Sequence, residues 1–120
     1  MAKGITLSDD YHWSASFGLY EWVTDYLVAR VRDPETRTRL REVVDLNFPG
    51  IDVRQLPAAG RREVLAALCG DMAAAARADP QIGTPEPDRS FLVGHVRVLT
   101  LMADDVMRTE EDDGRPDLPV

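Results

Sequence analysis

The stretch that most restricts the fold is SFGLYEWVTDYLVARV, residues 16–31, because it is apolar around most of its circumference. On a helical wheel the apolar side chains cover about 260° and leave one polar stripe of Glu21, Asp25 and Arg32. Such a helix either lies at the centre of a helical domain, or packs inward on one side and against another molecule on the other.

The two sides of this apolar surface differ in their chemistry. One side is mainly aliphatic, whereas the other carries Leu19, Trp22 and Tyr26. Aromatic residues with a polar group are enriched at protein interfaces. We therefore predict that these three residues contact a partner, which is either another protein or a second copy of the chain.

Start and stop signals divide the chain into four predicted helices. They cover approximately residues 16–32, 34–46, 57–76 and 90–107. The second helix begins with the capping sequence Asp33-Pro34-Glu35, and the third begins at Pro57. The segment DPQIGTPEPD, residues 79–88, holds three prolines and a glycine, which predicts a loop before the last helix.

These segments predict an all-α, single-domain four-helix bundle over residues 1–108, followed by a disordered acidic tail over residues 109–120. The residues before the first helix are expected to form a solvated arm whose Tyr11 and Trp13 dock on the bundle. Residues 51–56 alternate in polarity and predict an extended stretch, which is too short to predict a sheet.

Charge and cysteine content exclude several functional classes. The formal net charge is -7, and residues 104–120 carry seven acids against two arginines, so the chain repels nucleic-acid phosphates. Cys69 is the only cysteine, which precludes an internal disulfide and favours a reducing compartment. The sequence shows neither a signal peptide nor an apolar run of about 18 residues, so we expect a cytoplasmic protein outside the membrane.

The chain carries no motif for phosphate binding, zinc binding or covalent catalysis, so we expect no cofactor and no metal site. His12 lies next to Asp9 and Asp10, but one imidazole beside carboxylates is a weak pattern for a metal ion. Cys69 is expected at a core face, as an unreactive thiol.

His95 has two interpretations, because the wheel places it on the predicted inward face of the last helix together with Phe91 and Val98. Desolvation on such a face favours the neutral imidazole, which can act as a general base. In the other interpretation, the ring forms a hydrogen bond with a backbone carbonyl or a carboxylate inside the bundle and has a structural role.

The segment RSFLVGH, residues 89–95, resembles the signature of the HEPN ribonucleases. In that family an arginine is followed, after several residues, by a histidine near the start of a late helix in a four-helix bundle. The resemblance covers seven residues and implies that Arg89 and His95 are catalytic, acting on an RNA phosphate in a dimer.

Two functions follow from these patterns. The favoured one is a small acidic cytoplasmic protein-binding module without catalytic activity, which binds its partner through Leu19, Trp22 and Tyr26. In size, acidity and helical content such a module is similar in type to bacterial immunity proteins and antitoxins, and its tail is either a further binding element or a solvated end. The alternative is a HEPN-like ribonuclease that uses Arg89 and His95.

Overall fold

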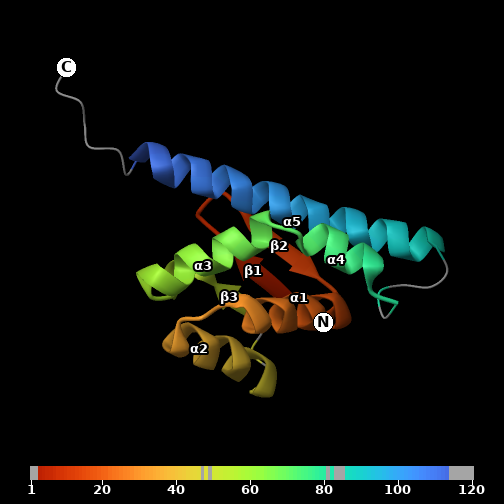
Figure 1. Ribbon diagram of the computed structural model, residues 1–120, viewed down its shortest axis with the longest axis horizontal. Coiled ribbons are helices and arrows are strands. Elements are labelled where there is room, and N and C mark those ends of the chain that lie inside the picture. The colour runs from red at the N-terminus through yellow and green to blue at the C-terminus, as the bar shows by residue number, and fades with distance from the viewer. Residues whose placement is uncertain (1–2, 47, 49, 81, 83–85, 114–120) are drawn as a thin grey trace.

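The computed structural model describes residues 3–46, 48, 50–80, 82 and 86–113. The elements, in chain order, are β1 (Lys3–Thr6), β2 (His12–Ala15), α1 (Phe17–Arg30), α2 (Pro34–Asp45), β3 (Gly50–Asp52), the short 3-10 helix η1 (Val53–Gln55), α3 (Ala58–Cys69), α4 (Met72–Ala78) and α5 (Glu86–Asp113). Figure 1 shows that the long helix α5 lies along one edge of the molecule, with the other elements on one side of it.

The prediction of an all-α four-helix bundle is wrong, because the described residues form a three-stranded mixed sheet together with five α-helices. The strand order is β2-β1-β3, and β1 pairs antiparallel with β2 and parallel with β3. Strands of three or four residues are too short for their alternation to stand out in a sequence. The pairing of Gly4 with Gly50 also joins distant segments of the chain, so only the tertiary structure reveals it.

The residues expected to form a solvated arm instead form β1 and β2. Trp13 and Ala15 face the core, whereas His12 and Ser14 face outward, as the two-residue period of a strand requires. Trp13 lies opposite Ile5 in the register, and both side chains are buried. The arm is therefore part of the core rather than an attachment to it.

Two of the predicted helices also differ in extent. The predicted third helix is interrupted at Gly70 and Asp71, which separate α3 from α4, because glycine and aspartate are weak helix formers inside an alanine-rich run. The last helix extends from Glu86 to Asp113 instead of over residues 90–107, so the first part of the predicted acidic tail is helical. Residues 114–120 of that tail lie outside the described residues.

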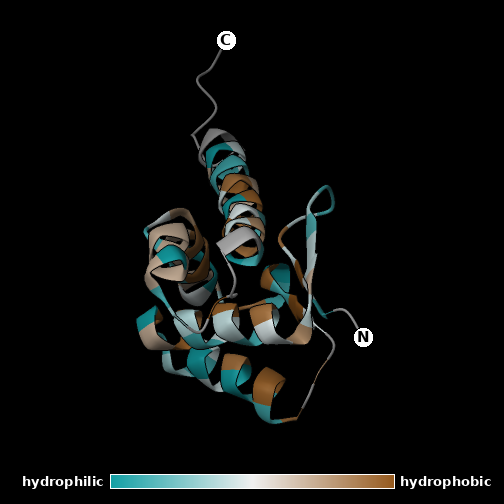
Figure 2. Cartoon of the chain, turned by 90° about the vertical axis from the view of Figure 1, so that its right-hand side faces the viewer, coloured by the Kyte–Doolittle hydropathy of each residue, from teal (hydrophilic) through white to brown (hydrophobic). Residues whose placement is uncertain are grey.

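The inner face of α5 closes the core. This helix packs along α3 and α4, whereas α1 packs against α2, α3, β1 and β2. Their buried side chains form one apolar cluster that includes Trp13, Leu27, Leu65 and Leu99. Figure 2, turned by 90°, shows α5 rising above the other elements toward its C-terminal end. The outer face of α5 therefore lies at the boundary of the molecule.

Candidate functional site

Two of the three residues expected to contact a partner belong to the core. Leu19 is 5% exposed and Tyr26 is 8% exposed, so very little of either side chain is accessible to a partner. The physical reason is that the chain covers this side of α1 itself, since Leu19 lies beside Ile82 and Leu92.

Trp22, the third of these residues, is half-buried and bound to its own chain. Its indole Nε1–H donates a hydrogen bond to the Asp79 carboxylate, with 2.8 Å between Nε1 and Oδ2. Its ring stacks on Tyr26 with 5.5 Å between ring centroids, and the Arg30 guanidinium lies 3.5 Å from the Tyr26 centroid. These contacts fix the orientation of Trp22 and leave only part of its surface free for another molecule.

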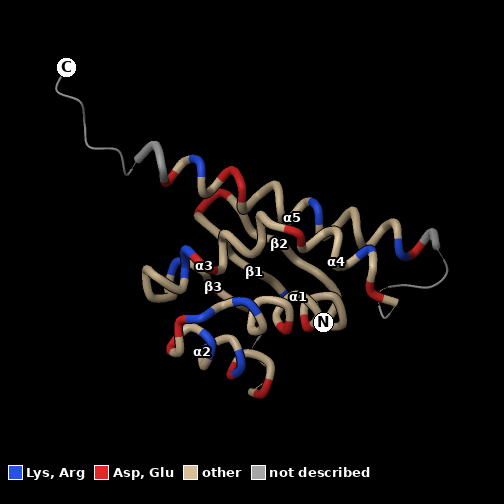
Figure 3. Tube along the Cα trace, in the orientation of Figure 1, with Lys and Arg blue, Asp and Glu red and all other residues tan. Residues whose placement is uncertain are grey.

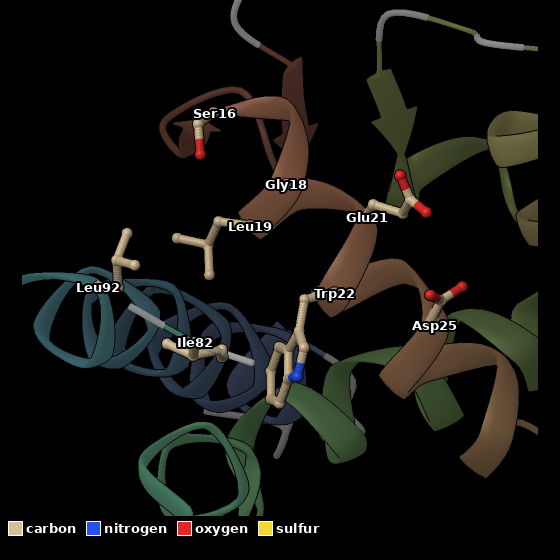
Figure 4. A pocket seen from close by; sticks show the side chains of 8 residues that line it. All are labelled: Ser16, Gly18, Leu19, Glu21, Trp22, Asp25, Ile82 and Leu92. Carbon is tan, nitrogen blue, oxygen red and sulfur yellow. The ribbon is translucent and has the colours of Figure 1, made fainter. Parts of the chain in front are cut away.

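The exposed part of Trp22 borders a hollow of about 480 Å³ (Figure 4). The hollow is lined by Ser16, Gly18, Leu19, Glu21, Trp22, Asp25, Ile82 and Leu92. Figure 4 shows the three aliphatic side chains gathered on one side, while the carboxylates of Glu21 and Asp25 point away from them. Since these polar groups do not converge on the apolar wall, the hollow lacks the arrangement that a catalytic site requires.

His95 joins α5 to the edge strand β2. Its Nε2 lies within hydrogen-bond distance of the Ser14 carbonyl, and because a carbonyl oxygen can only accept, Nε2 is the donor and carries the hydrogen. The ring stacks on Trp13 with centroids 4.9 Å apart, and the Trp13 indole donates in return to the His95 carbonyl at 3.0 Å. These reciprocal contacts fit the structural interpretation of His95.

Arg89 and His95 are not brought together. Six residues along an α-helix separate two side chains by about 9 Å along the axis and about 120° around it. The Arg89 guanidinium donates to the Arg77 carbonyl near the end of α4, at 3.3 Å, whereas His95 faces β2. Within one chain, Arg89 and His95 therefore lie on different sides of α5.

His12 and Cys69 are both engaged within the chain. His12 Nδ1 lies 2.8 Å from the Thr6 hydroxyl, on the outer side of the strand pair. The Cys69 thiol lies 3.5 Å from the Met107 sulfur, and burial raises the pKa of this thiol. Among the described residues, no three His, Cys, Asp or Glu side chains lie close enough together to hold a metal ion.

The outer face of α5 carries three large apolar side chains that are exposed to solvent. Phe91 is 74% exposed, Leu101 is 67% exposed and Val98 is 42% exposed. Together with Gly94 they fall within an arc of about 80°, on the side of the helix opposite its buried face. We call Phe91, Val98 and Leu101 the α5 ridge.

The prediction that Phe91 and Val98 face the core is wrong. The inner side of α5 is already occupied by five buried residues: Val93, Val96, Leu99, Ala103 and Val106. The apolar arc of this helix is therefore wider than the core can cover. A usable sequence signal was present, because positions 91, 94, 98 and 101 follow the alternating three-residue and four-residue spacing of a helix-pairing seam.

Charge is sparse along the ridge and denser beyond it. Figure 3 shows acidic residues concentrated toward the C-terminal part of α5. Asp105, the next position in the register of the ridge, accepts a hydrogen bond from the Tyr11 hydroxyl, and this bond raises the Tyr11 pKa. Glu110 forms an ion pair with Arg61 of α3. Both acids are thus engaged by the chain itself, and the apolar ridge ends at Asp105.

Comparison with known proteins found no matching family model, no similar curated protein and no similar solved structure. In the part of the chain that the structure describes, no helix combines the length and apolar character needed to span a membrane. The most distinctive surface feature of this fold is the exposed apolar α5 ridge.

Proposed function

We propose that the chain is a small protein-binding module without catalytic activity, and that it binds through the α5 ridge. One observation carries the proposal: Phe91, Val98 and Leu101 are exposed side by side on the helix face that points away from the core. Completely covering an apolar side chain of this size contributes about 1.5–3 kcal/mol. The free energy gained by burying a row of such side chains is greatest when a complementary protein surface excludes water from all of them.

The contacts of His95 and Arg89 support binding over catalysis. The His95 ring is occupied by Ser14 and Trp13, and Arg89 lies on a different side of α5. The net charge of -7 favours a protein partner over a nucleic acid. The single cysteine favours a reducing compartment, and we place the module in the cytoplasm. An immunity or antitoxin role is one form of this proposal, in which the covered partner is a toxic enzyme.

The proposal is tested by a photo-reactive benzoylphenylalanine placed at Val98, in cells that produce the protein naturally. Irradiation is expected to yield a discrete covalent adduct, because the ridge lies against its partner. The same probe at Ala66, an exposed position on α3, is the matched control and is expected to yield none.

The dependence on the ridge is tested with Leu101→Asp, which places a charge on the apolar surface and is expected to abolish the adduct. Leu101 is 67% exposed, so this variant is expected to keep the wild-type fold, as checked by circular dichroism. An equal adduct yield from positions 98 and 66, or an adduct at 98 that survives Leu101→Asp, would refute binding through the ridge.

A further inference from the structure

The α5 ridge and Gly94 together have a symmetric spacing. Positions 91, 94, 98 and 101 are separated by three, four and three residues, so the pattern reads the same from either end around position 96. An interface between two identical copies related by a two-fold axis needs such self-complementarity. If two α5 helices run antiparallel across this axis, Phe91 of one copy lies opposite Leu101 of the other, and Gly94 lies opposite Val98.

Gly94 is unexplained by the packing of a single copy. A Cβ atom built at this position meets nothing within 4 Å, so the chain has room for any small side chain there. Glycine in the interior of a helix lowers stability, because its backbone loses more conformational freedom than that of alanine. At the centre of an exposed apolar ridge, the missing side chain leaves a depression that the Val98 side chain of a second copy can fill.

The charges of α5 favour the antiparallel direction. Its first half, residues 86–99, has two acids and two arginines, whereas its second half, residues 100–113, has six acids and one arginine. Parallel pairing would place the two acidic halves side by side, and like charges at that distance repel each other. Antiparallel pairing around position 96 instead directs each acidic end away from the other.

From these three observations we propose that two copies of the chain associate through antiparallel α5 helices, with Val98 of each copy seated on Gly94 of the other. This inference rests on the proposed function and names its partner. The position of α5 at the edge of the molecule leaves its outer face free for such contact (Figures 1 and 2). Three apolar side chains per copy form a small interface, so we expect a dissociation constant on the order of 10–100 µM.

The association is measured by sedimentation equilibrium of the full chain from about 1 µM to about 500 µM. The average mass is expected to rise from 13.4 kDa toward twice that value. Leu101→Asp is expected to remain monomeric throughout. Ala66→Asp introduces the same charge at an exposed site on α3, so it is expected to associate like the wild type.

Gly94→Ala separates a role in pairing from a role in folding. Alanine is the better helix former, and its Cβ meets nothing in the single copy, so thermal unfolding of dilute protein is expected at a higher temperature. The same methyl group fills the depression that Val98 of the second copy would occupy, so the dissociation constant is expected to rise about tenfold or more, because overpacking a close contact is unfavourable. A variant that associates as tightly as the wild type would overturn the role assigned to Gly94.

The direction is tested with single cysteines in a Cys69→Ala background. Antiparallel pairing predicts a disulfide when copies carrying Phe91→Cys are mixed with copies carrying Leu101→Cys, and none in either preparation alone. Two Phe91→Cys side chains would lie about 15 Å apart along the helix axis in this arrangement. Disulfides within the separate preparations, and none specific to the mixture, would establish parallel pairing and overturn the proposed antiparallel arrangement.

The two proposals fail in distinguishable ways. A wild-type chain that stays monomeric at about 500 µM overturns the second copy as partner. If the probe at Val98 then still gives a Leu101-dependent adduct with a different protein, binding through the ridge stands and only its occupant was misassigned. If the probe gives no adduct either, both proposals fail.

Discussion

At the scale of single residues, the side chains with the most evident chemistry hold the fold together. His95 is the clearest example, because its Nε2–H donates to the Ser14 carbonyl and its ring stacks on Trp13. The sequence is compatible with both a structural and a catalytic interpretation of His95, because a histidine on an apolar helical face can have either role. The position of β2, which no local pattern reveals, supports the structural interpretation.

His95→Ala is expected to lower the free energy of unfolding by about 1–3 kcal/mol, because it leaves the Ser14 carbonyl without this donor and removes the stacking on Trp13. Urea denaturation measures the change. Arg97→Ala, two residues further along the same helix and exposed, is the control and is expected to change stability little. Equal stability of the two variants would contradict the structural role.

Tyr20 gives a prediction for alkaline pH. Burial raises its pKa to about 12 from 10.0, so the folded state disfavours the phenolate. The resulting stability is complete below pH 10 and is lost as the pH rises from about 10 to about 12. We expect that between pH 8 and pH 11 the wild type loses about 1 kcal/mol more than Tyr20→Phe, measured by urea denaturation. Parallel losses in both proteins would show that Tyr20 ionises freely in the fold.

At the scale of secondary-structure elements, close approach of helix backbones fixes the arrangement. The contact of α2 with α3 depends on Gly60, since a Cβ there would lie 1.7 Å from the Thr36 hydroxyl oxygen. That hydroxyl is held by the Asp33 carboxylate at 2.6 Å, and Thr36 is fully buried. Helix α3 can therefore accept a side chain at position 60 only if α2 moves.

Gly60→Ala is accordingly expected to destabilise the fold by about 1–3 kcal/mol, although alanine is the better helix former. Gly18→Ala in α1 is the matched control, because a Cβ there meets nothing within 4 Å. The control is expected to be neutral or to gain up to about 1 kcal/mol. Chemical denaturation of both variants tests the contrast, and a stabilised Gly60→Ala protein would show that α2 and α3 can separate without cost.

At the scale of the whole molecule, acid is expected to weaken the fold through specific carboxylates. Hydrogen bonds from Thr36 lower the pKa of Asp33, and the Arg54 guanidinium lowers that of Asp52. Both ionised carboxylates stabilise the folded state at pH values above about 3.8, which is their pKa in the unfolded chain. This stabilisation is lost as the pH falls through the lower pKa values of the folded state. The thermal midpoint should therefore change little between about pH 7 and pH 5 and fall below about pH 4.

Asp33→Asn tests the source of this pH dependence, because asparagine keeps an N-cap acceptor for Thr36 but does not titrate. Its thermal midpoint at neutral pH is expected to lie within a few degrees of the wild type. Its decrease on acidification should be smaller than that of the wild type. An identical decrease in both proteins would assign the acid sensitivity to other carboxylates.

The sequence by itself determined approximately where the helical segments lie and the exact start of one of them. The Asp33-Pro34 signal gave the beginning of α2, and the apolar run of residues 16–31 gave the helix α1. These features are encoded locally, by capping groups and by the period of 3.6 residues, so they can be read without knowing what lies nearby.

Only the tertiary structure decided the sheet and the direction of each apolar face. The strands β1 and β3 are recognised only through a pairing between distant segments, and Leu19 of α1 is buried because it lies beside Ile82 and Leu92. On α5 the apolar arc exceeds what one core can contact, so the packing alone determined that Phe91, Val98 and Leu101 face outward. A wheel measures how much apolar surface a helix has, but the neighbouring elements determine which part of that surface loses its contact with water.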